Sequence, residues 1–230
     1  MIDSCSVITF KVTEGLIMKY QLDKSKIDDI PCVSLYRPNK GHYSPSVIAC
    51  FMINDGWNEQ ALLELKDKAE ADILVGLQTD DHKYERLDII EGIVRCQPDE
   101  VNDVIALLDA RSASTIIGID VADVISLFEC GYSFQFVQAS ATGESEFHMI
   151  KTATYKMIGL LTNARNTKGV LIGTQSVQSL PLDAFAYISD AIEGLLSNDN
   201  AFTYLSSSMT DEPGCFRLKA VYTEEKQSHM

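Results

Sequence analysis

The chain has 230 residues, of which 46% are hydrophobic and 23% are charged, and its formal net charge at pH 7 is −14. This composition is typical of a globular protein with one large or two small domains, and it excludes a disordered chain. A negative charge of this size repels nucleic acid and anionic lipid, so we expect neither nucleic acid nor a membrane as a partner.

The six cysteines form no Cys-x-x-Cys pair, and most of them lie inside apolar runs. This distribution indicates buried, reduced thiols rather than a disulfide framework. No spacing of histidine and cysteine predicts a zinc site, and no apolar stretch reaches the length of a membrane span. The sequence therefore predicts a cytoplasmic protein without a bound metal.

The first half of the chain predicts an α/β fold. Strands are expected at 6–12, 32–36, 47–53 and 72–77, and a helix at 59–71. The order strand, turn, helix, strand over 47–77 is typical of a parallel sheet. The apolar residues Leu87, Ile89, Ile90 and Ile93 predict a partly helical segment at 80–97. Pro98, followed by two acids, predicts a helix that runs to about residue 110.

The second half predicts further alternation of strands and helices. Strands are expected at 115–119, 132–139 and 168–173, and helices at 120–130, 144–162 and 182–196. The last two strands, at 201–207 and 216–222, are expected to pair antiparallel around the turn at 211–214.

Two aspartates three residues apart follow the apolar run at 115–119. Asp120 is placed to cap the helix that follows it, and Asp123 lies on the same face of the first turn. Two interpretations remain open. The pair presents two carboxylates to a partner or to a water molecule, or Asp120 is only a helix cap and Asp123 a solvated acid.

The segment Ile116-Ile117-Gly118-Ile119-Asp120-Val121-Ala122-Asp123-Val124 resembles the acidic loop of the bacterial tubulin FtsZ family. That family then has an Ala-Ser-Gly-Glu opening to a long helix, which is similar to 141–144 here, and an Ala-x-Gly-Val-Leu strand, which is similar to 167–171. The order of predicted elements from 114 to 223 also matches. The chain is thus identified as resembling the tubulin/FtsZ-like proteins over about half its length.

The resemblance implies a division of the chain. We expect a shortened, parallel-sheet, GTPase-like α/β domain at 1–97 and a central connecting helix at 98–112. An FtsZ C-terminal-like domain with a four-stranded sheet follows at 113–223, and a disordered tail at 224–230. In the resembled family, the aspartates that match Asp120 and Asp123 act on the nucleotide of the neighbouring subunit. The resemblance thus makes Asp120 and Asp123 the candidate catalytic residues, and these two together with Gly118 and Val121 the candidate interaction residues.

The first half departs from the family at the phosphate-binding loop. The family has a run of glycines there, whereas this chain has Asn54-Asp55-Gly56-Trp57-Asn58-Glu59. A large indole and two acids oppose the binding of phosphate. We therefore expect no cofactor, and a filament cap or modulator without a competent GTP site of its own, acting on an FtsZ/tubulin-like polymer in cell division.

Two alternatives remain. The first is a divergent, self-polymerising GTPase that binds GTP, so that its partner is itself and hydrolysis is completed by a neighbouring subunit. The second is an enzyme that binds a small molecule in a cleft between the two halves. The sequence thus leaves open whether the chain is an enzyme.

Overall fold

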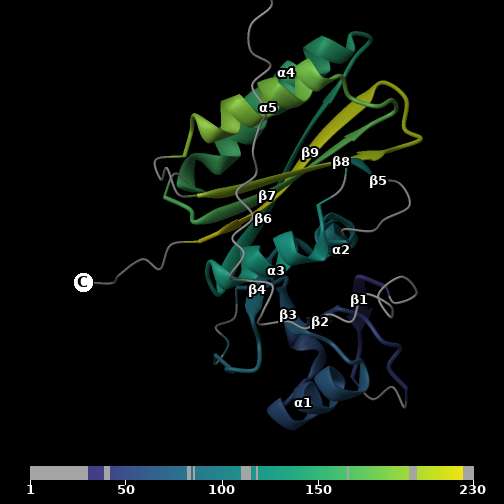
Figure 1. Ribbon diagram of the computed structural model, residues 1–230, viewed down its shortest axis with the longest axis vertical. Coiled ribbons are helices and arrows are strands. Elements are labelled where there is room, and N and C mark those ends of the chain that lie inside the picture. The colour runs from purple at the N-terminus through teal and green to yellow at the C-terminus, as the bar shows by residue number, and fades with distance from the viewer. Residues whose placement is uncertain are drawn as a thin grey trace, which may run out of the picture. The chain divides into compact units, whose positions relative to one another are not determined.

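The computed structural model describes residues 31–38, 42–81, 84, 86–109, 115–117, 119–164, 166–196 and 201–224 (Figure 1). The strand that we predicted at 6–12 and Gly118 lie outside these residues. The structure confirms the α/β class, with nine strands in one sheet in the order β1-β2-β3-β4-β6-β9-β7-β8-β5. The strands are β1 (Val33–Tyr36), β2 (Ile48–Met52), β3 (Ile73–Gln78), β4 (Gly92–Arg95), β5 (Thr115–Ile117), β6 (Ser133–Thr142), β7 (Gly169–Ser176), β8 (Phe202–Met209) and β9 (Cys215–Thr223).

The strands β1, β2, β3, β4 and β6 run parallel to one another. The residues of β3 are all buried, which explains why its sequence is a continuous apolar run rather than an alternating one. Helix α1 (Glu59–Lys68) packs its buried Leu62 and Leu65 into a core with Phe51 and Leu74. Because parallel strands share their direction, the turns that follow β1, β2, β3 and β4 lie at one edge of the sheet.

The prediction of a partly helical segment at 80–97 was wrong. The structure has the strand β4 there, and the segment before it is turn and irregular structure in its described part. The first three residues of β4 are buried, so the strand is apolar on both faces and shows no alternation. Leu87, Ile89 and Ile90 precede this strand of four residues. Together with it they give an apolar spacing that also fits a helix.

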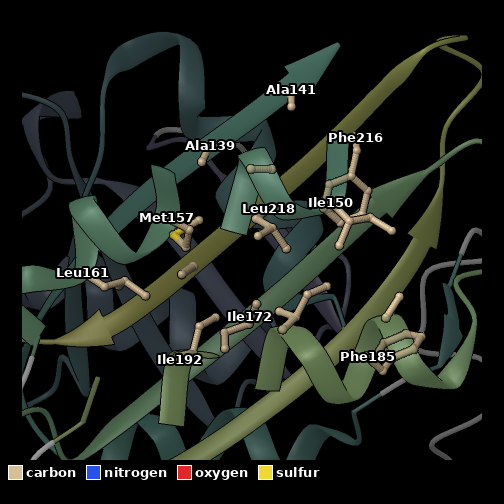
Figure 2. Close-up of a cluster of buried hydrophobic side chains, with 14 of the residues drawn as sticks. Ala139, Ala141, Ile150, Met157, Leu161, Ile172, Phe185, Ile192, Phe216 and Leu218 are labelled. Atoms are coloured by element: carbon tan, nitrogen blue, oxygen red, sulfur yellow. The ribbon is translucent and has the colours of Figure 1, made fainter. Parts of the chain in front are cut away.

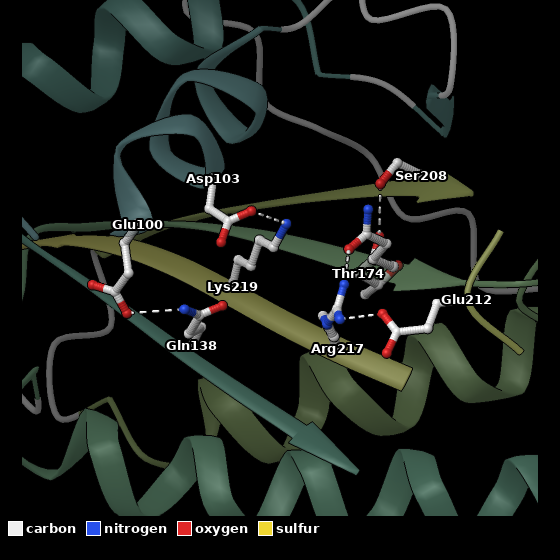
Figure 3. Close-up of polar contacts among 9 residues, drawn as sticks. Glu100, Asp103, Gln138, Thr174, Ser208, Glu212, Arg217 and Lys219 are labelled. Atoms are coloured by element: carbon white, nitrogen blue, oxygen red, sulfur yellow. Dashed lines mark hydrogen bonds and ion pairs between the residues drawn. The ribbon is translucent and has the colours of Figure 1, made fainter. Parts of the chain in front are cut away.

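The connecting helix begins with a 3-10 turn, Pro98–Glu100, and continues as α2 (Val101–Leu108). Gln97 and Glu100 form a capping box at its start. The helix packs against both β1 and β9, so it joins the two halves of the sheet as we predicted. Polar contacts hold it to the second half: Asp103 pairs with Lys219, and Gln138 donates to Glu100 at 3.0 Å (Figure 3).

The second half contains the mixed sheet β6-β9-β7-β8, with the short β5 beyond β8. Helices α4 (Glu146–Leu160) and α5 (Leu182–Glu193) cover one face of it (Figures 1 and 2). Their apolar residues, such as Met157 and Ile192, form one core with Ile172 and Leu218 from the strands. Helix α3 (Val121–Glu129) packs on the opposite face, where Gly169 leaves room for Leu127 and Cys130.

The prediction that the last two strands pair with each other was wrong. β7 lies between them, parallel to β8 and antiparallel to β9, so that Val170 is opposite both Thr203 and Tyr222. Strands next to each other in sequence often form a hairpin, and the turn around Pro213-Gly214 favoured one. Which strands lie next to each other depends on contacts between distant segments, and the local sequence does not reveal those contacts.

The boundaries that we predicted at 97, 112 and 223 remain predictions, and one sheet runs through the described parts of both halves. Of the predicted tail at 224–230, the structure describes Glu224. Glu224 donates its backbone N–H to the Ser133 carbonyl at 2.8 Å, and its carboxylate accepts a bond from the Ser133 hydroxyl. Residues 225–230 lie outside the described part of the chain.

Candidate functional site

The two aspartates of the acidic turn, Asp120 and Asp123, form a capping box at the start of α3. Oδ1 of Asp120 accepts the Asp123 backbone N–H at 2.9 Å, and Oδ2 of Asp123 accepts the Asp120 backbone N–H at 3.0 Å. The cap that we predicted at Asp120 is therefore present, and it is reciprocal. The capping box uses one oxygen of each carboxylate, so the second oxygen of each takes no part in these two bonds.

The environments of the two carboxylates differ. Asp120 is exposed, whereas Asp123 is half-buried. Burial, together with the negative charge of Asp120, raises the pKa of Asp123, although the bond from the Asp120 backbone N–H opposes this shift. The turn thus offers one solvent-facing carboxylate and one that a low-polarity surface partly encloses.

That surface includes Tyr204 of β8, which sequence reasoning missed. Burial and the nearby charge of Asp123 raise the pKa of Tyr204 to about 12, while a hydrogen bond with Ser126 lowers it. Tyr204 in turn stacks on the exposed Phe202, with ring centroids 6.4 Å apart and an angle of 7° between the planes. Phe202 is opposite Gly169, which lies against the end of α3 rather than its start. About eighty residues separate Tyr204 from the turn, and only the pairing of β8 brings them together.

The other two predicted interaction residues contribute little that the structure describes. Val121 is buried, so its side chain packs inside the fold rather than facing a partner. Gly118 lies outside the described residues. The accessible part of the site therefore consists of the exposed Asp120 and the half-buried Asp123.

The turn after β2 occupies the place where the resemblance implies a phosphate loop. It is a single 3-10 turn, Ile53–Asp55, that ends at Gly56 with φ +80°, a conformation that favours glycine. Asn58 then caps α1, and its side-chain oxygen accepts the Ala61 backbone N–H at 2.8 Å. The amino end of α1 is thus satisfied by the chain's own side chain.

An aromatic cluster fills the space beside this turn. Trp57 packs edge-on against Phe51, with ring centroids 5.8 Å apart, and lies 6.5 Å from Tyr43. Tyr43 in turn packs edge-on against Tyr36. The indole is therefore part of the packing over β1 and β2, as expected for a tryptophan that packs against the sheet.

Acidic residues predominate in the turns that follow the parallel strands. Asp80, after β3, accepts hydrogen bonds from Asn54 and from the Tyr84 hydroxyl. Of the charged residues that the structure describes directly after β1, β2, β3 and β4, one is basic and the others are acidic: Arg37 against Asp55, Asp80, Asp81, Asp99 and Glu100. The described part of this edge is therefore unfavourable for a polyanion, while Lys40 and Lys83 of the same turns lie outside the described residues.

The described residues contain no group of three or more His, Cys, Asp or Glu side chains that could hold a metal ion. Of their cysteines, Cys130 is half-buried and the others are buried. Ser140 is exposed and alternates with Ala139 and Ala141, which face α4, so it points away from His148 on that helix. No described helix is long and apolar enough to cross a membrane.

No protein-family model and no curated protein sequence matches the chain. Solved structures are similar to it, among them the following three. FtsZ from M. jannaschii, an empty dimer, has a TM-score of 0.61 and 17% identity over 80% of this chain and 64% of its own. CetZ2 from Haloferax volcanii, a GTPγS-bound protofilament, has a TM-score of 0.56 and 11% identity over 81% of this chain and 67% of its own. CetZ from Methanosaeta thermophila has a TM-score of 0.50 and 11% identity over 80% of this chain and 63% of its own.

The chain thus spans 64% of the length of the FtsZ structure. The connecting helix, the acidic turn and the two helices over the mixed sheet all lie within the described part of this chain. The resemblance expected from the acidic loop is confirmed at the level of the fold. The chain therefore has the fold of the FtsZ/tubulin-type proteins.

Proposed function

We propose that this chain docks through its acidic turn on the nucleotide-binding end of an FtsZ/tubulin-like polymer, and that it caps or modulates that polymer. The observation that carries the proposal is the contrast between its two ends. The acidic turn has an ordered, partly exposed pair of carboxylates, whereas the turn after β2 has an asparagine cap and acids in the place of a phosphate loop. Such a subunit joins a filament at one end only.

The charges support docking on a different protein rather than on a second copy end to end. In an end-to-end arrangement, the acidic turn of one copy would meet the edge formed by the turns after the parallel strands of the next. That edge is itself acidic in its described part. Like charges at a contact cost free energy unless a cation or a basic surface separates them. A polymer end that holds a nucleotide with its metal ion lacks this penalty.

The carboxylates act in this proposal by position and charge. Held at the start of α3, they accept hydrogen bonds from a water molecule or a basic group at the facing surface. The proposal therefore predicts that removing the charges abolishes docking even when the cap is retained.

The experiment is sedimentation of a purified FtsZ polymer with GTP, with and without this protein, while phosphate release is followed. We expect the wild-type chain to reduce the pelleted polymer or to change the rate of phosphate release. Asp120→Asn with Asp123→Asn keeps both cap acceptors and removes both charges, because asparagine caps a helix about as well as aspartate. This variant should lose the effect.

The matched control is Glu144→Gln with Glu146→Gln, which removes two charges near the start of α4 and leaves the acidic turn unchanged. It should behave as wild type. No effect of the wild-type chain on either readout would refute the proposal. An equal effect of the Asp120→Asn/Asp123→Asn variant would refute the role of the carboxylates.

A further inference from the structure

The outward face of α4 and α5 carries large apolar side chains that the fold leaves exposed. Tyr155 on α4 is 78% exposed, and Leu182 at the start of α5 is 80% exposed. Phe147 and Tyr187 are exposed on the same two helices. Phe147, Lys151 and Tyr155 follow one another at intervals of four, so they form one stripe along α4. An exposed apolar surface of this kind marks a site of association.

A positive charge lies within this face. The Lys151 ammonium is 4.2 Å from the centroid of the Phe147 ring and 6.0 Å from that of Tyr187, so it bridges α4 and α5. Lys156, on the same helix, turns instead to the sheet, where it donates to the Ser140 carbonyl of β6. Among the described residues, Lys151 has no acidic side chain within ion-pair distance. The face of a chain with a net charge of −14 thus contains a cation without an acidic partner among the described residues.

Negative charges lie on the neighbouring helix. Asp183, Asp190 and Glu193 are exposed on α5, and Tyr187 lies between the first two in sequence. The two helices run in the same direction, because each one connects parallel strands: α4 joins β6 to β7, and α5 joins β7 to β8. On this face, α4 therefore presents the Lys151 cation and α5 presents acidic side chains, with apolar side chains on both helices.

We propose that two copies of this chain associate through this face, about a two-fold axis that lies along α4 and α5. A rotation of this kind places α4 of each copy over α5 of the other. Lys151 then lies over Tyr187 of the second copy and between that copy's Asp183 and Asp190. The same contact occurs twice, and the exposed Tyr155 and Leu182 are buried on either side of it along the helices.

The second copy is the occupant because the face is complementary to itself. Elsewhere the acidic chain repels another copy, whereas here the Lys151 cation of each copy meets the acidic side chains on α5 of the other. The acidic turn lies on α3, on the opposite face of the sheet, so the dimer leaves it free. The inference is therefore independent of the proposed function, and either one can fail without the other.

The experiment is sedimentation equilibrium of the full chain over an about hundredfold range of concentration. The wild-type chain should show a monomer–dimer equilibrium. Tyr155→Ser with Leu182→Ser should abolish the dimer without affecting the fold, because both side chains are exposed in the monomer. Lys151→Glu and Asp190→Lys should each weaken association about tenfold or more, since each change occurs twice in the interface.

The decisive variant combines Lys151→Glu with Asp190→Lys, which exchanges the charges between the two helices. It should restore association to within about threefold of wild type. Lys68→Glu, on α1, is the control with the same change in net charge as Lys151→Glu, and it should leave the dimer unchanged. A wild-type chain that stays monomeric would overturn the proposal, as would a dimer that withstands the Tyr155→Ser/Leu182→Ser change.

Discussion

Asp103 on α2 and Lys219 on β9 form an ion pair of 2.8 Å, although 116 residues separate them in the sequence. The Lys219 side chain is only 10% exposed, so the pair is partly withdrawn from water. It lies on the face of the mixed sheet opposite α4 and α5. Figure 3 shows Gln138 of β6 and Arg217 of β9 on the same face. The pair therefore attaches the connecting helix to the second half of the sheet.

Asp103→Ala should lower the free energy of unfolding by about 1–3 kcal/mol, because it leaves the Lys219 ammonium nearly buried without its partner. Urea denaturation measures the change. The variant Asp103→Ala with Lys219→Met removes both charges and keeps an apolar stem of similar length, so it should recover most of the loss. Equal stability of the single variant and the wild type would show that the pair contributes nothing.

Gly92 in β4 lies where two phenylalanine rings meet. A Cβ at this position would be 2.5 Å from Cδ1 of Phe128 and 2.8 Å from Cε2 of Phe134, and these rings pack edge-on with centroids 4.7 Å apart. Gly92→Ala should therefore cost about 1–3 kcal/mol by overpacking.

Gly159 in α4 supplies the matched control for this position. A Cβ there meets nothing within 4 Å, so Gly159→Ala should be neutral or stabilise the fold by up to about 1 kcal/mol. Thermal unfolding of both variants measures the difference. A Gly92→Ala variant as stable as Gly159→Ala would mean that the two rings move apart freely.

The pH dependence of stability should reveal the environment of Asp123. Burial raises its pKa in the folded protein, so the fold binds this proton more tightly than the unfolded chain does. The contribution of Asp123 to stability is therefore fully present below its unfolded pKa of about 3.9, and it is lost as the pH rises through the higher folded pKa. Asp123→Asn cannot ionise, so it does not lose stability in this way as the pH rises. Its side-chain oxygen still accepts the Asp120 backbone N–H.

Thermal unfolding at pH 4 and pH 7 tests this expectation. The melting temperature of Asp123→Asn, minus that of the wild type, should be larger at pH 7 than at pH 4. Asp123→Ala serves as the control, because it removes the charge and also the acceptor of the cap, and it should be less stable than Asp123→Asn at both values. A difference that shrinks as the pH rises would contradict the raised pKa.

Local patterns were enough to predict most elements and the cap of the candidate site. The apolar run before Asn54 predicted β2, and Asp120 with Asp123 predicted a helix start, because each signal lies within one turn or one strand. The four-residue β4 was missed because its buried residues show no period. The pairing of β7 with both β8 and β9 was missed because pairing depends on contacts between distant segments.

The same limit applies to the site. The cap at Asp120 is local, so the sequence predicted it, whereas the return bond from the Asp120 backbone N–H to Asp123 was not predicted. The position of Tyr204 beside Asp123 depends on the register of β8 against β7, in which Tyr204 is opposite Leu171. The alternation of Phe202 and Tyr204 in the sequence does indicate one shared face of a strand, but not which helix covers it.

Trp57 is the single tryptophan of the chain, and it lies in the turn that stands in the place of a phosphate loop. Its fluorescence therefore reports directly on whether a nucleotide enters there. We expect magnesium and GTP at about 1 mM to leave the emission unchanged, because Asn58 already satisfies the amino end of α1 and the nearby acids repel phosphate.

Unfolding in urea should shift the Trp57 emission to longer wavelength, and this control establishes that the signal responds to the packing against Phe51. A saturable change with GTP that is absent with adenosine would overturn the expectation. It would favour a self-polymerising GTPase over a one-ended cap, since a chain with a nucleotide at this turn and carboxylates at the start of α3 has both halves of a filament contact.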